Sequence, residues 1–382
     1  MPAFDFDHPP ERAGSDSSKW RKYAGRDIIP MWVSDMDFAA PPAVIEALRQ
    51  RIDHGVFGYA DPGPEHIEAV IEGIQRDHHW QIDKDWLVWL PGMVTGLNLA
   101  CRAVGEPGDD VFTATPIYPP FLAAPGFSDR TLSTAPLQLS QNRWQWDWDA
   151  VRAALSPRTR LFMLCNPHNP VGRVFSREEL THIAALCEQH DIAICSDEIH
   201  CGLVLDPALT HTPIATLDEA IAQRTITLMA PSKTWNIPGL YCTLAIIPNA
   251  ALRRRFTHAM RGIVPHVGVL GLTAAAAAYR HGTPWRRALI DYLRINRDLT
   301  LSHLNALGLP TAPIEATYLA WIDCRHLPDP VALFEHHGVG LSDGKDFGAP
   351  GFVRLNFGCP RHRLQEALSR MAHAVQSRHP SK

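Results

Sequence analysis

Arg160-Leu-Phe-Met-Leu-Cys165 is an apolar run of strand length, and the polar turn Asn166-Pro-His-Asn-Pro-Val-Gly172 follows it directly. Residues 178–190 come next, with apolar side chains at helical spacing, and a second apolar run at 192–195 closes the unit. Two buried strands joined by a helical crossover are typical of parallel pairing in a sheet that is covered on both faces. This stretch therefore predicts an α/β fold.

The same alternation of strands and helices extends in both directions along the chain. We expect further strands at 85–90, 111–114 and 225–229, and helices at 43–48, 97–104 and 285–307. After about residue 285 the pattern changes to one long helix followed by shorter, antiparallel pieces. The fold class is therefore α/β, with a large domain built on a mostly parallel sheet and a smaller α+β domain. We expect an N-terminal arm with part of the small domain in 1–48, the large domain in 49–284 and the small domain in 285–382.

Composition narrows the classes of function. The chain has 382 residues, 46% of them hydrophobic, and a formal net charge of −4, so it lacks the basic surface that nucleic acids and anionic membranes require. No run of about 18 apolar residues could span a membrane. The N-terminus, residues 1–8, lacks the charged and apolar segments of a signal peptide. We expect a cytoplasmic protein.

Cysteine usage agrees with a cytoplasmic protein, and histidine usage indicates that no metal is bound. The eight cysteines are scattered without a Cys-x-x-Cys pair, which indicates free thiols in a reducing compartment. The histidine pairs at 78–79 and 336–337 lack the spacing of metal ligands, so we expect no metal site.

Polar residues follow the predicted strands where a ligand would bind. Tyr118, Asn169, Asp197 and Lys233 each come shortly after a strand, and ligands of open α/β sheets bind at the carboxyl ends of the strands. The turn 92–95 precedes a helix and offers backbone N–H groups to a phosphate. Taken singly, these features have ordinary readings: Asp197 as a helix cap, Lys233 as a surface lysine, the glycines as a turn. Their occurrence together, in this order, favours a shared site.

Motifs spread over nearly the whole chain carry a family resemblance. Asn166 to Gly172, and Asp197-Glu198 followed by Ser232-Lys233, are typical of fold-type I enzymes that use pyridoxal 5′-phosphate (PLP). Met31-Trp-Val-Ser-Asp-Met-Asp-Phe38, the histidine after Asp-Glu-Ile, and Arg354-Leu-Asn-Phe-Gly-Cys-Pro-Arg361 are narrower. With these motifs the sequence resembles the PatB/MalY-type cysteine-S-conjugate β-lyases, also called cystathionine β-lyases, within the class I/II aminotransferases.

The resemblance implies roles for individual residues. Lys233 matches the catalytic lysine, which carries PLP as a Schiff base. Asp197 matches the carboxylate that pairs with the pyridinium nitrogen. The residues implied in cofactor binding are Tyr59, Met93, Val94, Tyr118, Asn169, Asp197, His200, Ser232 and Lys233. The residues implied around the substrate are Asp35, Tyr118 and Arg354, with Arg354 gripping the α-carboxylate. Tyr59 matches a tyrosine that reaches the phosphate of the neighbouring subunit, which implies a homodimer.

The sequence also departs from related patterns. In aminotransferases of this fold a tyrosine commonly replaces His200, and an arginine after the lysine often binds the phosphate. Here the stretch 238–242 has no arginine, which leaves the phosphate to the helix end and to hydroxyl donors. Trp235 and Pro238 differ from the Phe and Ala expected in the lyase group.

Three functions stay open at this point. A β-lyase would cleave L-cystathionine or a related cysteine S-conjugate to a thiol, pyruvate and ammonia, and the subgroup resemblance favours it. An aminotransferase would share every step up to removal of the Cα proton. A PLP-binding regulator would turn over little, although regulators of this fold usually carry an added helix-turn-helix, for which 382 residues leave no room.

Overall fold

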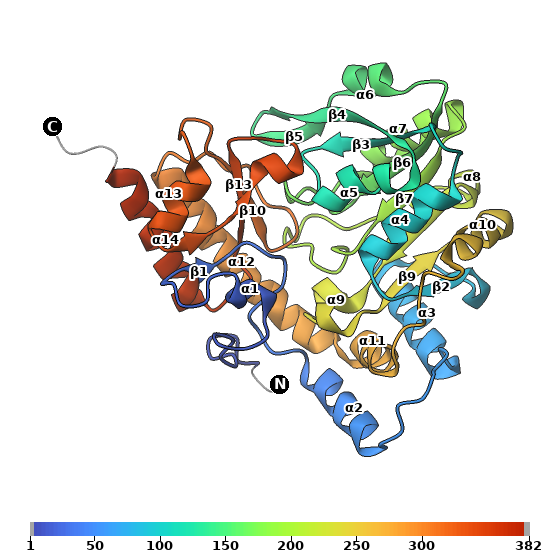
Figure 1. The fold of residues 1–382 in the computed structure, drawn as a ribbon, viewed down its shortest axis with the longest axis horizontal. Coiled ribbons are helices and arrows are strands. Elements are labelled where there is room, and N and C mark those ends of the chain that lie inside the picture. The colour runs from blue at the N-terminus through green and yellow to red at the C-terminus, as the bar shows by residue number, and fades with distance from the viewer. Residues whose placement is uncertain (1–3, 378–382) are drawn as a thin grey trace.

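The computed structural model describes residues 4–377, and an eight-stranded sheet forms its centre (Figure 1). In spatial order the strands are β2 (Leu87–Leu90), β9 (Thr243–Ile246), β8 (Thr225–Met229), β7 (Ala193–Asp197), β6 (Thr159–Cys165), β3 (Asp110–Thr115), β4 (Thr131–Ser140) and β5 (Arg143–Trp146). The five strands from β8 to β4 pair in parallel, and β9 and β5 run in the direction opposite to the other six strands of this sheet. The predicted mostly parallel α/β sheet is confirmed.

Both faces of this sheet are buried, as the apolar run of β6 requires. Leu161 and Met163 pack on one face, whereas Phe162 and Leu164 pack on the other, because successive side chains of a strand point to opposite sides. The first face is covered by α4 (Met93–Ala103) and α10 (Ala250–Met260). The second is covered by α6 (Trp148–Ala154), α7 (Arg177–Gln189) and α8 (Glu219–Gln223).

Helices at the β2–β9 end of the sheet connect it to the rest of the molecule. α2 (Pro42–Asp53) and α3 (Pro64–His78) both pack against α11 (Val269–His281). The long helix α12 (Thr283–Ala306) then leads from α11 toward the C-terminal elements, drawn in orange and red in Figure 1. Within residues 4–377, no helix combines the length and the apolar character needed to cross a membrane.

Two small sheets lie beyond α12. β10 (Leu319–Asp323), β13 (Phe352–Asn356) and β12 (Ser342–Asp343) form an antiparallel sheet, and β1 (Ile29–Pro30) pairs in parallel with β11 (Val339–Gly340). The helices of this part are α1 (Ser18–Arg21), α13 (Pro330–His336) and α14 (Arg361–Gln376). The β1–β11 pair ties the N-terminal arm to the C-terminal third.

The separation of the sheets supports a division of the chain. All strands of the large sheet lie between residues 87 and 246, whereas the small sheets draw on 29–30 and 319–356. We therefore propose the division at residues 48 and 284. The outer ends of its first and last parts, 1–3 and 378–382, lie outside the described residues.

Candidate active site

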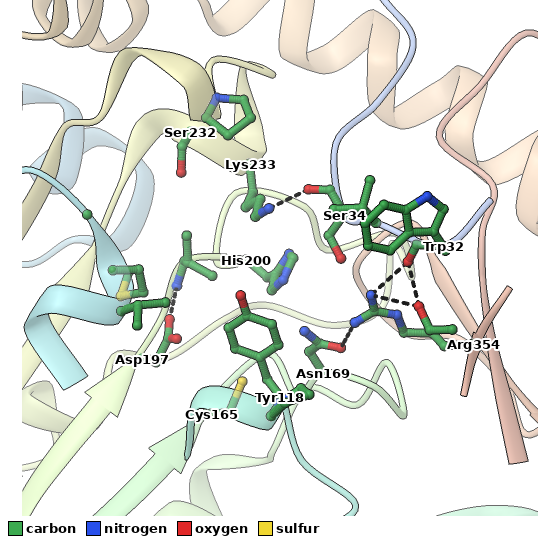
Figure 2. A pocket seen from close by; sticks show the side chains of 18 of the residues that line it. Trp32, Ser34, Tyr118, Cys165, Asn169, Asp197, His200, Ser232, Lys233 and Arg354 are labelled. Carbon is green, nitrogen blue, oxygen red and sulfur yellow. Dashed lines mark hydrogen bonds between the residues drawn. The ribbon is translucent and has the colours of Figure 1, made fainter. Parts of the chain in front are cut away.

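A cavity of about 970 Å³ opens at the carboxyl ends of β3, β6, β7 and β8. Tyr118, Asn169, Asp197 and Lys233 all line it, and Figure 2 shows them around one hollow, with Arg354 beside Asn169 and across the hollow from Asp197. These four side chains follow four neighbouring strands of one parallel sheet, so the fold itself brings them together.

Lys233 lies just past β8, on the single-turn helix α9 (Pro231–Thr234). Its amine donates a hydrogen bond to the backbone carbonyl of Ser34, which also accepts one from the Tyr318 hydroxyl at 2.9 Å. Burial disfavours the charged ammonium and lowers the pKa of Lys233 to about 8. A large fraction of this amine is therefore unprotonated, and nucleophilic, at mildly alkaline pH.

Asp197 is the last residue of β7 and is 3% exposed. One carboxylate oxygen accepts a hydrogen bond from the backbone N–H of Ile199 at 3.0 Å. Among residues 4–377 no cationic side chain comes within ion-pair distance of this carboxylate, and burial raises the pKa of Asp197 to about 7. A buried acid of this kind is suited to a ligand that brings its own N–H or positive charge.

Arg354 on β13 is the counterpart of Asp197: a buried cation without a carboxylate partner in the described part of the chain. Its guanidinium donates to the Asn169 side-chain oxygen and to the Trp32 carbonyl, both at 2.9 Å, and lies 4.7 Å from the centre of the Phe347 ring. Its Nε has no hydrogen-bond partner, and burial lowers the pKa of Arg354 to about 10. The site thus holds a buried guanidinium whose charge is not balanced by a carboxylate of residues 4–377, and a substrate carboxylate would balance it.

The contact with Arg354 also orients Asn169. Because the amide oxygen of Asn169 accepts from the guanidinium, its NH₂ group is left to donate to a ligand. A ligand oxygen that accepts a hydrogen bond would satisfy this NH₂ group.

The start of α4 differs from the sequence-based expectation. The helix begins at Met93, not at residue 97, so the predicted turn 92–95 forms its N-cap and first turn. Gly92 is the N-cap residue and has no side chain that could accept hydrogen bonds from the first N–H groups of the helix. The N–H groups of Met93 and Val94 lie at this uncapped helix end, which lines the cavity. Ser232 lines the cavity as well. Together these groups offer hydrogen-bond donors to an anion.

His200 and Tyr118 complete the wall. His200 is buried, its Nδ1 has no hydrogen-bond partner, and burial lowers its pKa to about 3, so the ring is neutral. The Tyr118 side chain points into the cavity (Figure 2), and burial raises its pKa. Both rings that line the cavity are therefore neutral.

Two of the predicted site residues do not line this cavity. Asp35 is not part of the lining, and one of its carboxylate oxygens accepts from Arg12 at 2.7 Å. Tyr59 is fully exposed in the loop between α2 and α3. Of the two residues that depart from the lyase pattern, Pro238 lines the cavity, whereas Trp235 packs on Tyr279 with ring centres 5.1 Å apart.

Several residues of the site carry no sequence signal that points to them. Ser34 contributes a backbone carbonyl, which any residue would supply. Tyr318 follows Thr317, whose φ of +75° is rare for a β-branched residue. This turn places a buried tyrosine hydroxyl beside Ser34. Neither the carbonyl nor the turn is visible in the pattern of residue types.

Comparisons with known proteins agree with the geometry. Residues 26–371 match the family model of class I and II aminotransferases. Cystathionine β-lyase PatB of Bacillus subtilis is 38% identical over 97% of this chain and its own full length. The crystal structure of OvoB is 49% identical, with a TM-score of 0.96 over 98% of this chain and 100% of OvoB.

Cystalysin from Treponema denticola, whose structure contains PLP, is 31% identical. Its TM-score is 0.94, and the match covers 98% of this chain and 99% of cystalysin. The chain therefore belongs to the class I and II aminotransferase family and, within it, to the group of cystathionine β-lyases represented by PatB.

Proposed function

We propose that this protein is a PLP-dependent C–S β-lyase that cleaves L-cystathionine or a related cysteine S-conjugate to a thiol, pyruvate and ammonia. The observation that carries the proposal is one cavity holding a lysine with a lowered pKa, an unpaired buried carboxylate and an unpaired buried guanidinium. The relatives described above supply the reaction class.

The residues of the cavity fit PLP group by group. Asp197 would face the protonated ring nitrogen, the NH₂ of Asn169 would donate to the phenolic oxygen, and the ring of Tyr118 would stack on the cofactor. The phosphate would bind the N-terminus of α4, where Met93 and Val94 offer N–H groups, together with Ser232. Lys233 is the nucleophilic amine to which the cofactor attaches. His200 would contact the cofactor through its neutral ring.

Each side chain then has a defined task in the reaction. When bound, PLP supplies an electron sink for the negative charge that develops at the substrate Cα. Arg354 binds the α-carboxylate and fixes the substrate relative to Lys233. The unprotonated amine of Lys233 accepts the Cα proton, and its pKa of about 8 is close to the optimum for a general base near neutral pH. The Cβ–S bond breaks, the sulfur leaves as a thiolate, and water releases pyruvate and ammonia from the remainder.

We further propose a homodimer that acts in the cytoplasm. The full exposure of Tyr59 supports a role at a neighbouring subunit, where it would reach the phosphate. The eight cysteines are all free and seven are buried, which is ordinary for a reducing compartment.

Product analysis tests the proposed reaction. The PLP-loaded protein is incubated with L-cystathionine in the absence of any 2-oxo acid, and pyruvate and free thiol are followed with time. We expect steady formation of both in a ratio of one to one, and none with the Lys233→Ala variant. Amino-group transfer that requires a 2-oxo acid, without pyruvate from cystathionine, would show an aminotransferase. Retained activity in Lys233→Ala would remove Lys233 from its role.

A further inference from the structure

Besides the residues around Lys233 and Asp197, the cavity is lined by the N-terminal arm and by residues within 341–346, and we call this part of the lining the mouth. This mouth is a second surface, distinct in chemistry from the cofactor end. Its lining includes Lys22, Trp32, Leu341, Asp343, Lys345 and Asp346. A substrate anchored by its α-carboxylate on Arg354 would extend its sulfur substituent within this remaining space, so the charges of the mouth bear on which substituents are accepted.

Lys22 is the cation of the mouth that is left unpaired. Its amine lies 4.7 Å from the centre of the Trp32 ring and 5.0 Å from that of Tyr23. No carboxylate of residues 4–377 comes within ion-pair distance of it. Lys345, in contrast, is neutralised by Asp343 at 2.9 Å. The cation–π contact holds the Lys22 amine in place without satisfying its charge.

Trp32 connects this cation to the substrate clamp. Its indole N–H donates to the Lys19 carbonyl at 3.1 Å, which fixes the ring under Lys22. Its own carbonyl accepts from Arg354 at 2.9 Å. One residue therefore supports a guanidinium through its backbone and an ammonium through its side chain (Trp32 and Arg354 in Figure 2). The two cations are suited to two carboxylates of one substrate.

We propose that Lys22, held on the Trp32 ring, binds a carboxylate carried by the sulfur substituent and so determines substrate specificity. This inference rests on the proposed β-lyase function and adds the residue that favours cysteine S-conjugates with a distal carboxylate over those without one. Asp346 lines the same mouth and forms no ion pair within residues 4–377. It would accept an ammonium group on the same substituent, so that an amino-acid end meets a complementary charge of each sign.

Two substrates of matched size isolate the contribution of the charge. S-(2-carboxyethyl)-L-cysteine and S-(3-methylbutyl)-L-cysteine share the reacting Cβ–S bond and have substituents of the same shape, one ending in a carboxylate and the other in an isopropyl group. The specificity ratio is kcat/KM for the carboxylate substrate divided by kcat/KM for the uncharged one. We expect Lys22→Met to lower this ratio about fivefold, chiefly by raising KM of the carboxylate substrate, which is the effect that an exposed ion pair allows. Lys22→Arg keeps the charge and should restore the ratio. Added salt should lower the wild-type ratio toward that of Lys22→Met.

Controls separate this specificity from other failures. Arg21→Met removes a neighbouring exposed cation of α1 that does not line the cavity, and should leave the ratio unchanged. An unchanged ratio in Lys22→Met, or an equal loss for both substrates, would overturn the inference. Absence of pyruvate from both substrates in the wild type would contradict the proposed function instead. In that case the dissociation constants of the two compounds are measured with the PLP-loaded Lys233→Ala protein. Adding Lys22→Met to that protein is expected to weaken binding of the carboxylate compound about fivefold relative to the uncharged one.

Discussion

Burial acts on Lys233 and Asp197 in opposite directions and brings both pKa values close to neutrality. The pKa of the amine falls to about 8, and that of the carboxyl rises to about 7, because each charged form loses hydration. In both cases the environment favours the neutral form. A bound ligand with a positive group beside Asp197 would restore the carboxylate, which is why the two residues act as a set.

The pKa of Lys233 predicts its chemical reactivity in the cofactor-free protein. Only the unprotonated amine reacts with an acylating reagent, and a lowered pKa makes that form dominant above about pH 8. Pulsed acetylation with acetic anhydride, followed by peptide mass spectrometry, should give a labelling midpoint near pH 8 at Lys233. A midpoint near 10.4, the value of an ordinary lysine, would contradict the effect of burial.

Arg354→Lys tests the carboxylate clamp. Lysine keeps a positive charge but loses the planar, two-pronged donor set that also holds Asn169 and the Trp32 carbonyl. We expect KM for L-cystathionine to rise roughly 10- to 100-fold, the value of charge-assisted hydrogen bonds, with a smaller change in kcat. Steady-state kinetics measures both constants. An unchanged KM would remove Arg354 from carboxylate binding.

Part of this site could be predicted from the residue types in the sequence. Lys233, Asp197 and Asn169 carry unusual functional groups directly after apolar runs, so their shared location followed from the rule for parallel strands. The Ser34 carbonyl meets Lys233 and the Tyr318 hydroxyl across segments far apart in sequence, and the Lys22–Trp32 contact forms within the folded N-terminal arm. Such contacts depend on the tertiary fold, and no local pattern encodes them.

A strap formed by residues 32–38 lines the cavity with residues 32–34 and is held by two asparagines. Asn236, three residues after Lys233, donates to the carbonyls of Met36 and Phe38. Asn356, two residues after Arg354, donates to the carbonyls of Val33 and Asp35 at 2.6 and 2.8 Å. Elements that carry the two functional cations therefore also fix the strap whose Ser34 carbonyl meets Lys233.

Removing one of these supports should loosen the strap. Asn356→Ala leaves two strap carbonyls without their donor in a buried setting, and we expect unfolding free energy to fall by about 2 kcal/mol. Urea denaturation of the holoprotein measures this change. Asn305→Ala, at an exposed position of α12, is the matched control and should change stability by less than about 0.5 kcal/mol. Equal stability of the two variants would show that the strap is held by other contacts.

Elements were predictable where their periodicity is strong and self-contained. β8 has the predicted bounds, and α12 and β6 agree within two residues, because each is long or uniformly apolar. β9 is only four residues long, and β4 is largely exposed on its outer half, so both lack a clear signal. The predicted start of α4 was wrong by four residues, because a glycine at position 96 is typical of a turn before a helix. In the structure Gly96 lies within the helix and allows close packing on Leu228.

The loop between α2 and α3 exposes several apolar residues on the surface of the molecule. Val56 is 61% exposed and Phe57 56%, and Tyr59 is fully exposed. A cluster of this kind marks a contact surface in soluble proteins. It lies in the same loop as the tyrosine that the family resemblance assigns to the neighbouring subunit, so both observations support the proposed homodimer.

Two linked measurements test the dimer and its contribution to the site. Light scattering of the purified protein should give about twice the chain mass of 42.5 kDa. Tyr59→Phe removes only the hydroxyl and should weaken PLP binding about tenfold, because a hydrogen bond to a charged phosphate has about that value. The mass of the particle measured by light scattering should stay the same. A dimer whose PLP affinity is unaffected by Tyr59→Phe would place this tyrosine outside the cofactor site.

The identity of the lysine that carries the cofactor tests the proposed site most directly. The PLP-loaded protein is reduced with borohydride, which makes the attachment permanent, and is then digested and examined by mass spectrometry. The position of Lys233 after β8, its lowered pKa and its proximity to Asp197 predict the label on Lys233 alone. A label on another lysine, or an unlabelled protein, would contradict the proposed active site.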